Sequence, residues 1–257
     1  MAGYGLWVIV MLIPLSLFLV ALVAGFVDAI AGGGGLLTVP ALLLTGIDPQ
    51  LVLGTNKAQG VFGTATSLGR FSSSGLLDRR RAGQSFVPAL VGAACGVWLV
   101  TRIRPDILTP LVMALLGGVA VFMIFNRTPE VAMPSRARSL AVTGGVAMLL
   151  GFYDGFFGPG TGTFLIIAYA YLWHDSLDAA SANAKVVNFG SNLASMVTFL
   201  VLGRICWKLA LPMAAGQVIG GWLGAHLTIR KGRNVVRMAV IVVSIALILR
   251  LLWKLIG

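Results

Sequence analysis

The sequence predicts an all-α, polytopic membrane protein made of two inverted repeats, each with a glycine-broken re-entrant hairpin and three transmembrane helices. The first observation is composition, since 58% of the 257 residues are hydrophobic and only 11% are charged. The second is that several apolar runs approach or exceed the roughly 20 residues that a helix needs to cross a bilayer. The third is that motifs of the first half return in the same order in the second half.

The apolar runs are separated by basic segments. They are Leu6–Ile30, Ala137–Phe157, Met213–Ile229 and Val235–Leu252. The chain has a formal net charge of +11, and its arginines gather where these runs end, as in "LLDRRRAG" (Leu76–Gly83). Cytoplasmic loops of membrane proteins collect Lys and Arg, so the expected partner is the lipid bilayer and not a nucleic acid. The first run lacks a basic segment before it and is too long for a signal peptide, so we expect it to be a retained membrane helix.

Three pairs of motifs define the repeat. They match Gly25–Gly35 with Gly151–Thr161, Gly54–Ser67 with Ala182–Ser195, and Val87–Gly96 with Leu211–Gly220. The first pair aligns Asp28 with Asp154, the second aligns Lys57 with Lys185, and the third aligns prolines that are followed by glycines at four-residue spacing. We therefore expect a first repeat over 1–126, a linker on the cytoplasmic side over 127–138, and a second repeat over 139–257, all in one integral membrane domain.

Each repeat predicts five helices in the same order. For the first repeat these are 6–31, 36–46, 50–69, 83–101 and 106–125. The first helix ends at four consecutive glycines, Gly32–Gly35, and the second is the short apolar stretch that follows them. The third carries Lys57, the fourth follows Arg79–Arg81, and the fifth lies between Arg104 and Arg127.

The second repeat predicts helices over 139–157, 161–173, 178–201, 208–229 and 234–254. Here the break is "GPGTG" (Gly158–Gly162), and the helix that contains Lys185 follows the short one. The last two helices are separated by the basic segment "RKGRNVVR" (Arg230–Arg237).

Loop charges indicate that the two repeats are inverted. One side would carry 11 basic residues, namely Arg70, Arg79, Arg80, Arg81, Arg127, Arg136, Arg138, Arg230, Lys231, Arg233 and Arg237. The other would carry six, namely Arg102, Arg104, Arg204, Lys208, Arg250 and Lys254. The positive-inside rule assigns the first side to the cytoplasm, which places both termini in the periplasm. If the chain starts outside and residue 70 is inside, the segments between them must cross the membrane an odd number of times. This condition is met if 6–31 and 36–46 form a re-entrant hairpin with its tip at the four glycines, because only the helix over 50–69 then crosses.

The two hairpin tips would approach from opposite faces and meet near the midplane, where secondary transporters hold their substrates between broken helices. Helix N-termini that begin after a glycine break present free N–H groups and a positive dipole, and two lysines add ammonium groups, so we expect an anion site. The candidate binding residues are Gly33, Gly34, Gly35, Thr38, Asn56, Lys57, Gln59, Gly160, Thr161, Asn183, Lys185, Asn188 and Asn192, with Thr55 as a further hydroxyl.

Other interpretations of these residues stay open at this point. Lys57 and Lys185 could snorkel to a membrane interface, and Gly32–Gly35 could serve close helix packing, which is the main interpretation of the spaced glycines in the third motif pair. The intramembrane acids Asp28 and Asp154 could cap the broken backbone, pair with the lysines or carry a coupling proton.

Several function classes find no support in the sequence. The two histidines stand far apart without ligand spacing, so we expect no metal site and no cofactor. Cys95 and Cys206 lie in or beside apolar helices and are expected to be small buried thiols without a disulfide. "GPGTG" lacks the Lys-Ser/Thr of a nucleotide phosphate loop, and no nucleophile grouping indicates an enzyme.

"GFVDAIAGGGGLLTVPALLLTGIDPQLVLGTNKAQG" (Gly25–Gly60), together with "GFYDGFFGPGTGTF" and "ANAKVVNFGSN" in the second half, resembles the sulfite exporter TauE/SafE family of membrane permeases. The resemblance covers about residues 6–255. It implies a bacterial inner-membrane protein that moves sulfite or organosulfonates such as sulfoacetate. The chain has Asn183 where the family motif "A-T-A-K" has threonine, which leaves selectivity in question.

We therefore expect a secondary transporter of a small sulfur-containing anion, with export as the preferred direction. It would work by alternating access around the two tips. The alternative is a membrane-embedded enzyme or assembly factor that uses Asp28 and Asp154. Coupling to protons or to the membrane potential, and assembly as a homo-oligomer, are both compatible with the sequence.

Overall fold

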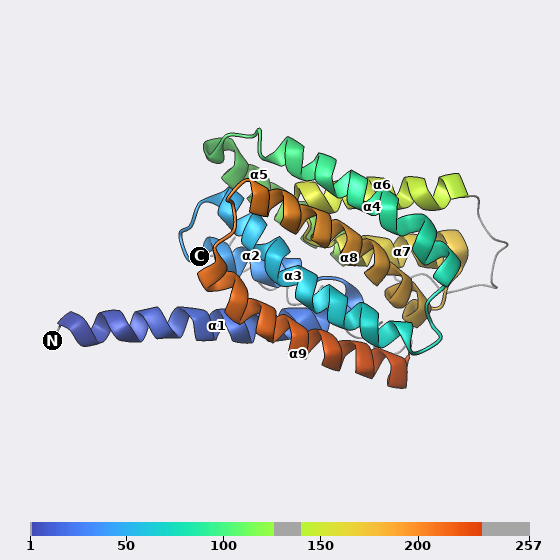
Figure 1. Cartoon of the computed structure of the whole chain (residues 1–257), viewed down its shortest axis with the longest axis horizontal. Coiled ribbons are helices and arrows are strands. Elements are labelled where there is room, and N and C mark those ends of the chain that lie inside the picture. The colour runs from blue at the N-terminus through green and yellow to red at the C-terminus, as the bar shows by residue number, and fades with distance from the viewer. Residues whose placement is uncertain (1, 126–139, 233–257) are drawn as a thin grey trace.

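The structure, a computed structural model, describes residues 2–125 and 140–232, and all elements in these ranges are helical (Figure 1). They are α1 (Ala2–Ala31), α2 (Gly35–Leu43), α3 (Pro49–Ser72), α4 (Arg79–Val100), α5 (Pro105–Phe125), α6 (Leu140–Phe156), α7 (Thr161–Trp173), α8 (Leu177–Val201) and α9 (Trp207–Lys231). These bounds agree with the predicted helices to within four residues. The expected linker over 127–138 and the expected helix over 234–254 lie outside the described residues.

The largest difference at an interior boundary is the start of α4, which begins four residues before the predicted position. Asp78 is the N-cap residue, and its Oδ1 accepts hydrogen bonds from the backbone N–H groups of Arg80 at 3.0 Å and Arg81 at 3.1 Å. Such a cap satisfies two of the four free N–H groups of a helix start. The cap therefore draws the three arginines into the helix, where an argument from charge had placed them in a loop.

Both helix breaks depend on glycine. The φ angle of Gly32 is +77°, and those of Gly158 and Gly160 are +98° and +86°, a region that L-residues with a side chain rarely adopt. The two breaks also touch each other, because a Cβ on Gly32 would lie 2.5 Å from Gly162 Cα and one on Gly35 would lie 3.1 Å from Pro159 Cα. The tips of the two halves thus meet, as predicted.

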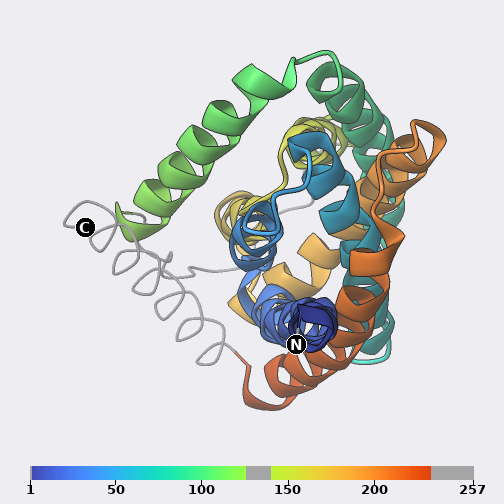
Figure 2. The ribbon, with the colours of Figure 1, turned by 90° about the vertical axis from the view of Figure 1, so that its left-hand side faces the viewer.

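The two halves are interleaved. The long helix α1 packs against α9, as Figure 2 shows in a view along the bundle, and its counterpart α6 packs against α4. The spaced glycines make this possible: a Cβ on Gly220 would lie 2.8 Å from the backbone N of Phe26, and one on Gly96 would lie 2.6 Å from the backbone N of Phe156. The packing interpretation of this motif pair is therefore confirmed.

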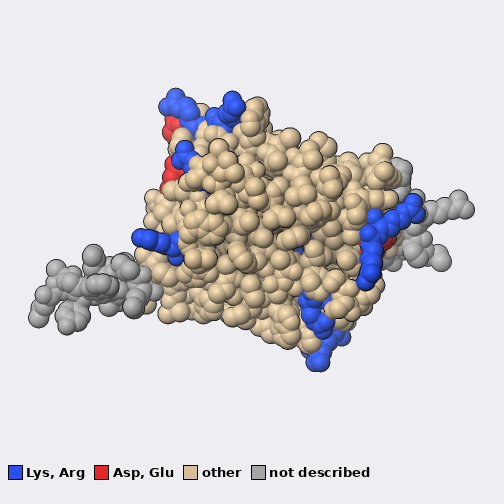
Figure 3. All heavy atoms as spheres, viewed as in Figure 1, with Lys and Arg blue, Asp and Glu red and all other residues tan. Residues whose placement is uncertain are grey.

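Contacts between loops define two ends of the molecule. At the Arg104 end (loops 44–48, 101–104 and 202–206), Gln50 Nε2 donates to the carbonyl of Ile103 at 3.2 Å. At the Arg81 end (loops 73–78 and 174–176 and the end of α9), the Arg81 guanidinium binds the Asp175 carboxylate at 2.9 Å. Lys and Arg side chains gather at these two ends, with a band of other residues between them (Figure 3).

The two helix breaks are reached from opposite ends. Helix α1 runs parallel to α9, because Gly216 of α9 meets Leu22 and Gly220 meets Phe26. Helix α1 therefore comes from the Arg104 end, where α9 begins, and α2 returns to that end. Helix α6 runs parallel to α4 from the Arg81 end, and α7 returns there. The short helices therefore point in opposite directions along the bundle.

The outer surface between the ends is apolar. Among the described residues, three helical segments are long and apolar enough to cross a membrane: Leu12–Ala31, Arg79–Val100 and Leu177–Val201. Large hydrophobic side chains such as Leu149 and Trp98 are exposed on this surface. Cys95 is exposed as well and Cys206 is half-buried, so the prediction of two buried thiols was wrong, although both are free. An exposed apolar surface is what lipid would cover.

Candidate functional site

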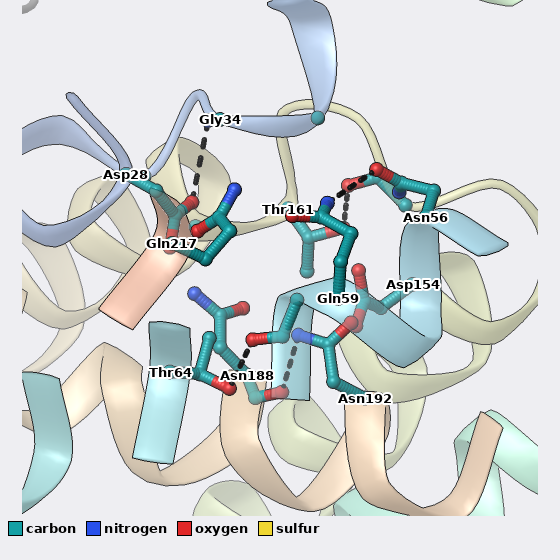
Figure 4. A pocket seen from close by; sticks show the side chains of 15 residues that line it. Asp28, Gly34, Asn56, Gln59, Thr64, Asp154, Thr161, Asn188, Asn192 and Gln217 are labelled. Atoms are coloured by element: carbon teal, nitrogen blue, oxygen red, sulfur yellow. Dashed lines mark hydrogen bonds between the residues drawn. The ribbon is translucent and has the colours of Figure 1, made fainter. Parts of the chain in front are cut away.

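A polar cavity of about 40 Å³ lies where the two tips meet (Figure 4). A single water needs roughly 10–15 Å³ of such space, so this volume holds a few waters or one small ion. The residues that line it are Asp28, Gly32, Gly34, Gly35, Asn56, Gln59, Gly60, Thr64, Asp154, Gly158, Thr161, Gly162, Asn188, Asn192 and Gln217. Both halves of the chain therefore contribute to one cavity.

The structure brings most of the predicted site residues together. Gly34, Gly35, Asn56, Gln59, Thr161, Asn188 and Asn192 line the cavity, together with Asp28 and Asp154. The first residues of α2 and α7, Gly35 and Thr161, are among them, so both short helices begin at the cavity wall. Gly33, Thr38, Lys57, Gly160, Asn183 and Lys185 lie outside the lining.

The two lysines are bound to the two acids in a crossed pattern. Lys57 Nζ of the first half lies 2.8 Å from Asp154 Oδ1 of the second half. Lys185 Nζ of the second half lies 2.7 Å from Asp28 Oδ2 of the first half, and it also donates to the Asp28 backbone carbonyl. Both ion pairs therefore tie one half of the molecule to the other.

These pairs decide between the alternatives for the charged residues. The exposed fractions of the Lys57 and Lys185 side chains are 2% and 0%, so neither lysine snorkels to an interface. Asp28 combines pairing with capping, because its Oδ1 accepts a bond of 3.3 Å from the backbone N–H of Gly34, just before α2. The cavity wall thus carries the carboxylates, and the ammonium groups lie behind them.

The two ion pairs differ in how fully each carboxylate is held. Asp154 has both oxygens engaged, since Lys57 binds Oδ1 and the Ser191 hydroxyl donates to Oδ2. Asp28 has Oδ2 bound by Lys185, while Oδ1 has only the 3.3 Å bond from Gly34. The side chain of Asp28 is 20% exposed and that of Asp154 is 5% exposed. Asp28 is therefore the more accessible carboxylate.

A chain of side-chain hydrogen bonds leads from α2 into the cavity. The Thr38 hydroxyl donates to Asn56 Oδ1 at 2.6 Å, and Gln59 Nε2 donates to the same oxygen at 3.0 Å. Gln59 Oε1 is buried and has no hydrogen-bond partner among the described residues. A buried oxygen left unpaired costs about 1–3 kcal/mol, so this atom marks a place for a ligand or a water.

Asn183 lies at the Arg81 end and has no contact with the cavity. Its Oδ1 accepts from the backbone N–H of Asp78, the cap of α4, at 2.9 Å, and its Nδ2 donates to Asp175 at 2.9 Å. Thr55 makes the matching bond in the first half, where its hydroxyl accepts at 2.9 Å from Cys206, the cap residue of α9. Asn183 therefore joins α8 to the start of α4, and Thr55 joins α3 to the start of α9.

The same cluster affects the charge of the α3–α4 loop. Burial alone would raise the pKa of Asp78, but hydrogen bonds from the Arg81 backbone and guanidinium and from the Arg80 backbone lower this pKa overall. The Asp78 carboxylate thus stays ionised and keeps its cap well below neutral pH.

Gly160, another predicted binding residue outside the cavity lining, helps to shape the start of a helix. It is the N-cap of α7 in the left-handed region, and a Cβ there would meet the Val119 side chain of α5.

Sequence reasoning missed several lining residues, of which Gln217 on α9 is the most informative. Its side chain packs against α1 and α3, where Cβ atoms on Gly25 and Gly63 would lie 2.8 Å from Gln217 Oε1 and 3.1 Å from Gln217 Cβ, respectively. An amide within an apolar, glycine-rich membrane helix was the available signal, because such groups are costly in hydrocarbon. Gly32, Gly60, Thr64, Gly158 and Gly162 were also missed as lining residues.

The groups that line the cavity are suited to binding a small polar ligand. Within residues 2–125 and 140–232, no three His, Cys, Asp or Glu side chains come together as metal ligands would. The lining instead offers side-chain amides, hydroxyls and two helix starts around two neutralised carboxylates.

Comparison with known proteins finds relatives over nearly the whole chain. The profile of the sulfite exporter TauE/SafE family matches residues 17–251. The probable membrane transporter protein of Haemophilus influenzae is 40% identical over 89% of this chain and 90% of its own length. The probable membrane transporter protein ORF9 of a Sinorhizobium species is 37% identical over 92% and 91%, and the probable membrane transporter protein YfcA of Escherichia coli K12 is 33% identical over 92% and 88%. No solved structure matches the chain.

Proposed function

The chain belongs to the sulfite exporter TauE/SafE family, and from that premise we propose that it is a secondary transporter, acting in export, of a small sulfur-containing anion such as sulfite or an organosulfonate. The family is one of multi-pass membrane transporters, so the alternative of a membrane-embedded enzyme or assembly factor is set aside. The observation that carries the proposal is the polar cavity between two glycine-broken helix tips, one from each half.

The chemistry of the cavity supports an anion as substrate. Two helix starts direct partial positive charge at the cavity. Asn188 brings an amide group to the opposite wall, where Nδ2 of Asn192 donates to the Asn188 backbone carbonyl at 2.8 Å (Figure 4). The hydrogen-bond chain from Thr38 can also run in reverse, because the Thr38 hydroxyl lies 3.2 Å from the Gly34 carbonyl and can donate there instead. With the amides of Asn56 and Gln59 turned over, Gln59 presents its NH₂ group to the cavity.

The arrangement of the helices supports alternating access. In this proposal α1–α2 and α6–α7 are re-entrant hairpins of two inverted repeats, and their tips share the substrate site near the midplane. The Arg81 end, with the larger number of basic residues, faces the cytoplasm of a bacterial inner membrane. Both termini then lie in the periplasm. Rocking of the packed group α1, α3 and α9 against the group α4, α6 and α8 would expose the cavity to each side in turn.

Transport by purified protein tests the proposal. Liposomes with the reconstituted protein should accumulate labelled sulfite or methanesulfonate, and Asn188→Leu should weaken the apparent affinity by about 10- to 150-fold, the effect of losing one hydrogen bond to a charged ligand. No flux of any small sulfur-containing anion by a folded protein would refute the function.

Two threonines of α3 offer a matched control. Thr64 lines the cavity and Thr66 is turned away from it, yet each hydroxyl donates to the carbonyl four residues earlier at 2.8 Å. Thr64→Val and Thr66→Val therefore remove the same bond to the fourth residue back from the same helix, and Thr64→Val also removes a contact of 3.1 Å with the Val61 carbonyl. Only the first should change uptake.

A further inference from the structure

The charges around the cavity cancel before any substrate arrives. Asp28 and Asp154 contribute two negative charges, and Lys57 and Lys185 contribute two positive charges, each pair at 2.7–2.8 Å. A monovalent anion that enters the buried site would leave one uncompensated charge, and such a charge costs several kcal/mol in a low-dielectric environment. Under the proposed function, the site must therefore gain a positive charge when it binds the anion.

The structure distinguishes the two carboxylates that could provide it. Both oxygens of Asp154 are held, by Lys57 and by Ser191, and its side chain is almost fully buried. Asp28 lines the cavity with one oxygen that has only a long bond from the Gly34 backbone, and its lysine stands behind it. Lys185 also donates to the Asp28 backbone carbonyl, so it stays in place when the carboxylate is neutral.

We propose that each monovalent anion binds together with one proton, that Asp28 receives this proton, and that Lys185 then serves as the counter-ion of the anion. This inference rests on the proposed function and adds its coupling ion. The proton comes from the surrounding water and converts the Asp28 carboxylate to a carboxylic acid. The site gains one positive charge from the proton and one negative charge from the anion, so its net charge stays zero.

The groups that face Asp28 agree with this assignment. Helix α8 brings Lys185, α3 brings Lys57 within electrostatic range, and α6 brings Asp154 to the same cavity. Helix α9 brings the uncharged Gln217, and the described parts of α2 and α7 that touch α1 carry no titratable side chain there. With Asp28 neutral, the remaining charges are two positive and one negative, which favours a monovalent anion.

Calorimetry with methanesulfonate tests the inference, because the charge of this probe does not change near neutral pH. Titration of the purified full chain in two buffers of different protonation enthalpy counts the protons taken up per anion. We expect about one proton per anion and an affinity that falls as pH rises, by up to about tenfold for each pH unit. Asp28→Asn, which resembles the protonated state, should bind the probe with no proton uptake and no pH dependence.

Asp48→Asn is the matched control. Asp48 is a carboxylate at the Arg104 end that caps α3, and asparagine caps helices equally well. This variant should keep the proton count of the unmodified chain.

Binding without proton uptake by the unmodified chain would overturn the inference and leave the proposed function standing, and this measurement needs no variant to fold. Equal proton uptake by Asp28→Asn would also overturn it. If neither methanesulfonate nor sulfite binds the unmodified chain or Asp28→Asn at any pH, the proposed function fails and the inference fails with it.

Discussion

Replacing Gly32 with alanine tests the contact between the two helix tips. Gly32 has a φ of +77°, and a Cβ there would lie 2.5 Å from both Gly162 Cα and the backbone N of Thr163. The left-handed conformation costs an L-residue about 1–2 kcal/mol, and overpacking against a rigid neighbour costs a further 1–3 kcal/mol. We therefore expect Gly32→Ala to lower the free energy of unfolding by about 2–5 kcal/mol and to separate the tips.

Neighbouring glycines should respond in a graded order. A Cβ on Gly34 would lie 2.8 Å from the Ala24 carbonyl oxygen, without a left-handed φ, and one on Gly35 would lie 3.1 Å from Pro159 Cα. Gly34→Ala should thus be less harmful than Gly32→Ala, and Gly35→Ala the mildest of the three. Gly145 on α6 provides the control, because a Cβ there meets no atom within 4 Å. Alanine is the better helix former, so Gly145→Ala should be neutral or stabilising by up to about 1 kcal/mol.

Melting temperature in detergent and methanesulfonate uptake in liposomes measure the two consequences. Gly32→Ala should lower both, and Gly145→Ala should lower neither. If both variants melt and transport alike, Gly32 lies in ordinary helix, and the meeting of the tips is not how the site is built.

Other variants test the remaining assignments. Lys57→Met should lower the free energy of unfolding by about 3–5 kcal/mol, because it leaves Asp154 buried without a counter-charge. Adding Asp154→Asn should recover most of this stability in a melting assay. A double variant no more stable than the single one would contradict the pairing. Asn183→Thr should keep the anion affinity and slightly lower the melting temperature, since threonine retains an acceptor for the α4 cap but loses the amide donor; altered anion selectivity would argue against this role. In a cysteine-free variant, an impermeant maleimide added outside should label cysteines placed at 101–106 and spare those at 79–81; equal labelling would refute the proposed orientation.

Helix positions could be predicted because hydrocarbon imposes one solution on an apolar run. A chain that crosses a bilayer must satisfy its backbone internally, so apolar length and glycine breaks locate helices closely. The short helix over 161–173 was predicted with its observed bounds. The early start of α4 shows the limit, since a cap at Asp78 outweighs the preference of arginines for a loop.

The composition of the site was harder to predict because it depends on which face of each helix is turned inward. On α8, Asn188 and Asn192 are four residues apart and share one face, whereas Asn183 is five residues before Asn188 and points elsewhere. All three were predicted from residue type alone, and a test of helical spacing would have separated Asn183 from the others. The sequence marks Gln217 as a costly amide in an apolar helix, but its place at the cavity depends on α9 packing against α1.

The pairing of the charges could not be obtained from the repeat at all. Lys57 follows Asp28 by 29 residues and Lys185 follows Asp154 by 31, so pairing within each half was as compatible with the sequence as pairing between halves. The side chains decide it: Asp28 on α1 binds Lys185 of α8 and Asp154 on α6 binds Lys57 of α3, although α1 also contacts α3 and α6 also packs on α8.

Crossed pairing has a consequence for movement between the packed helix groups. Each ion pair joins the group α1, α3 and α9 to the group α4, α6 and α8, so a rotation that opens the cavity would strain both pairs while both are intact. In the proposed cycle, proton uptake at Asp28 weakens one of them and leaves Lys57–Asp154, further fixed by Ser191, as the remaining tie. The two groups of helices would then move about the more completely bound pair. On this reasoning the difference between the two carboxylates, and not the symmetry of the repeat, is what couples binding of an anion and a proton to a change in access.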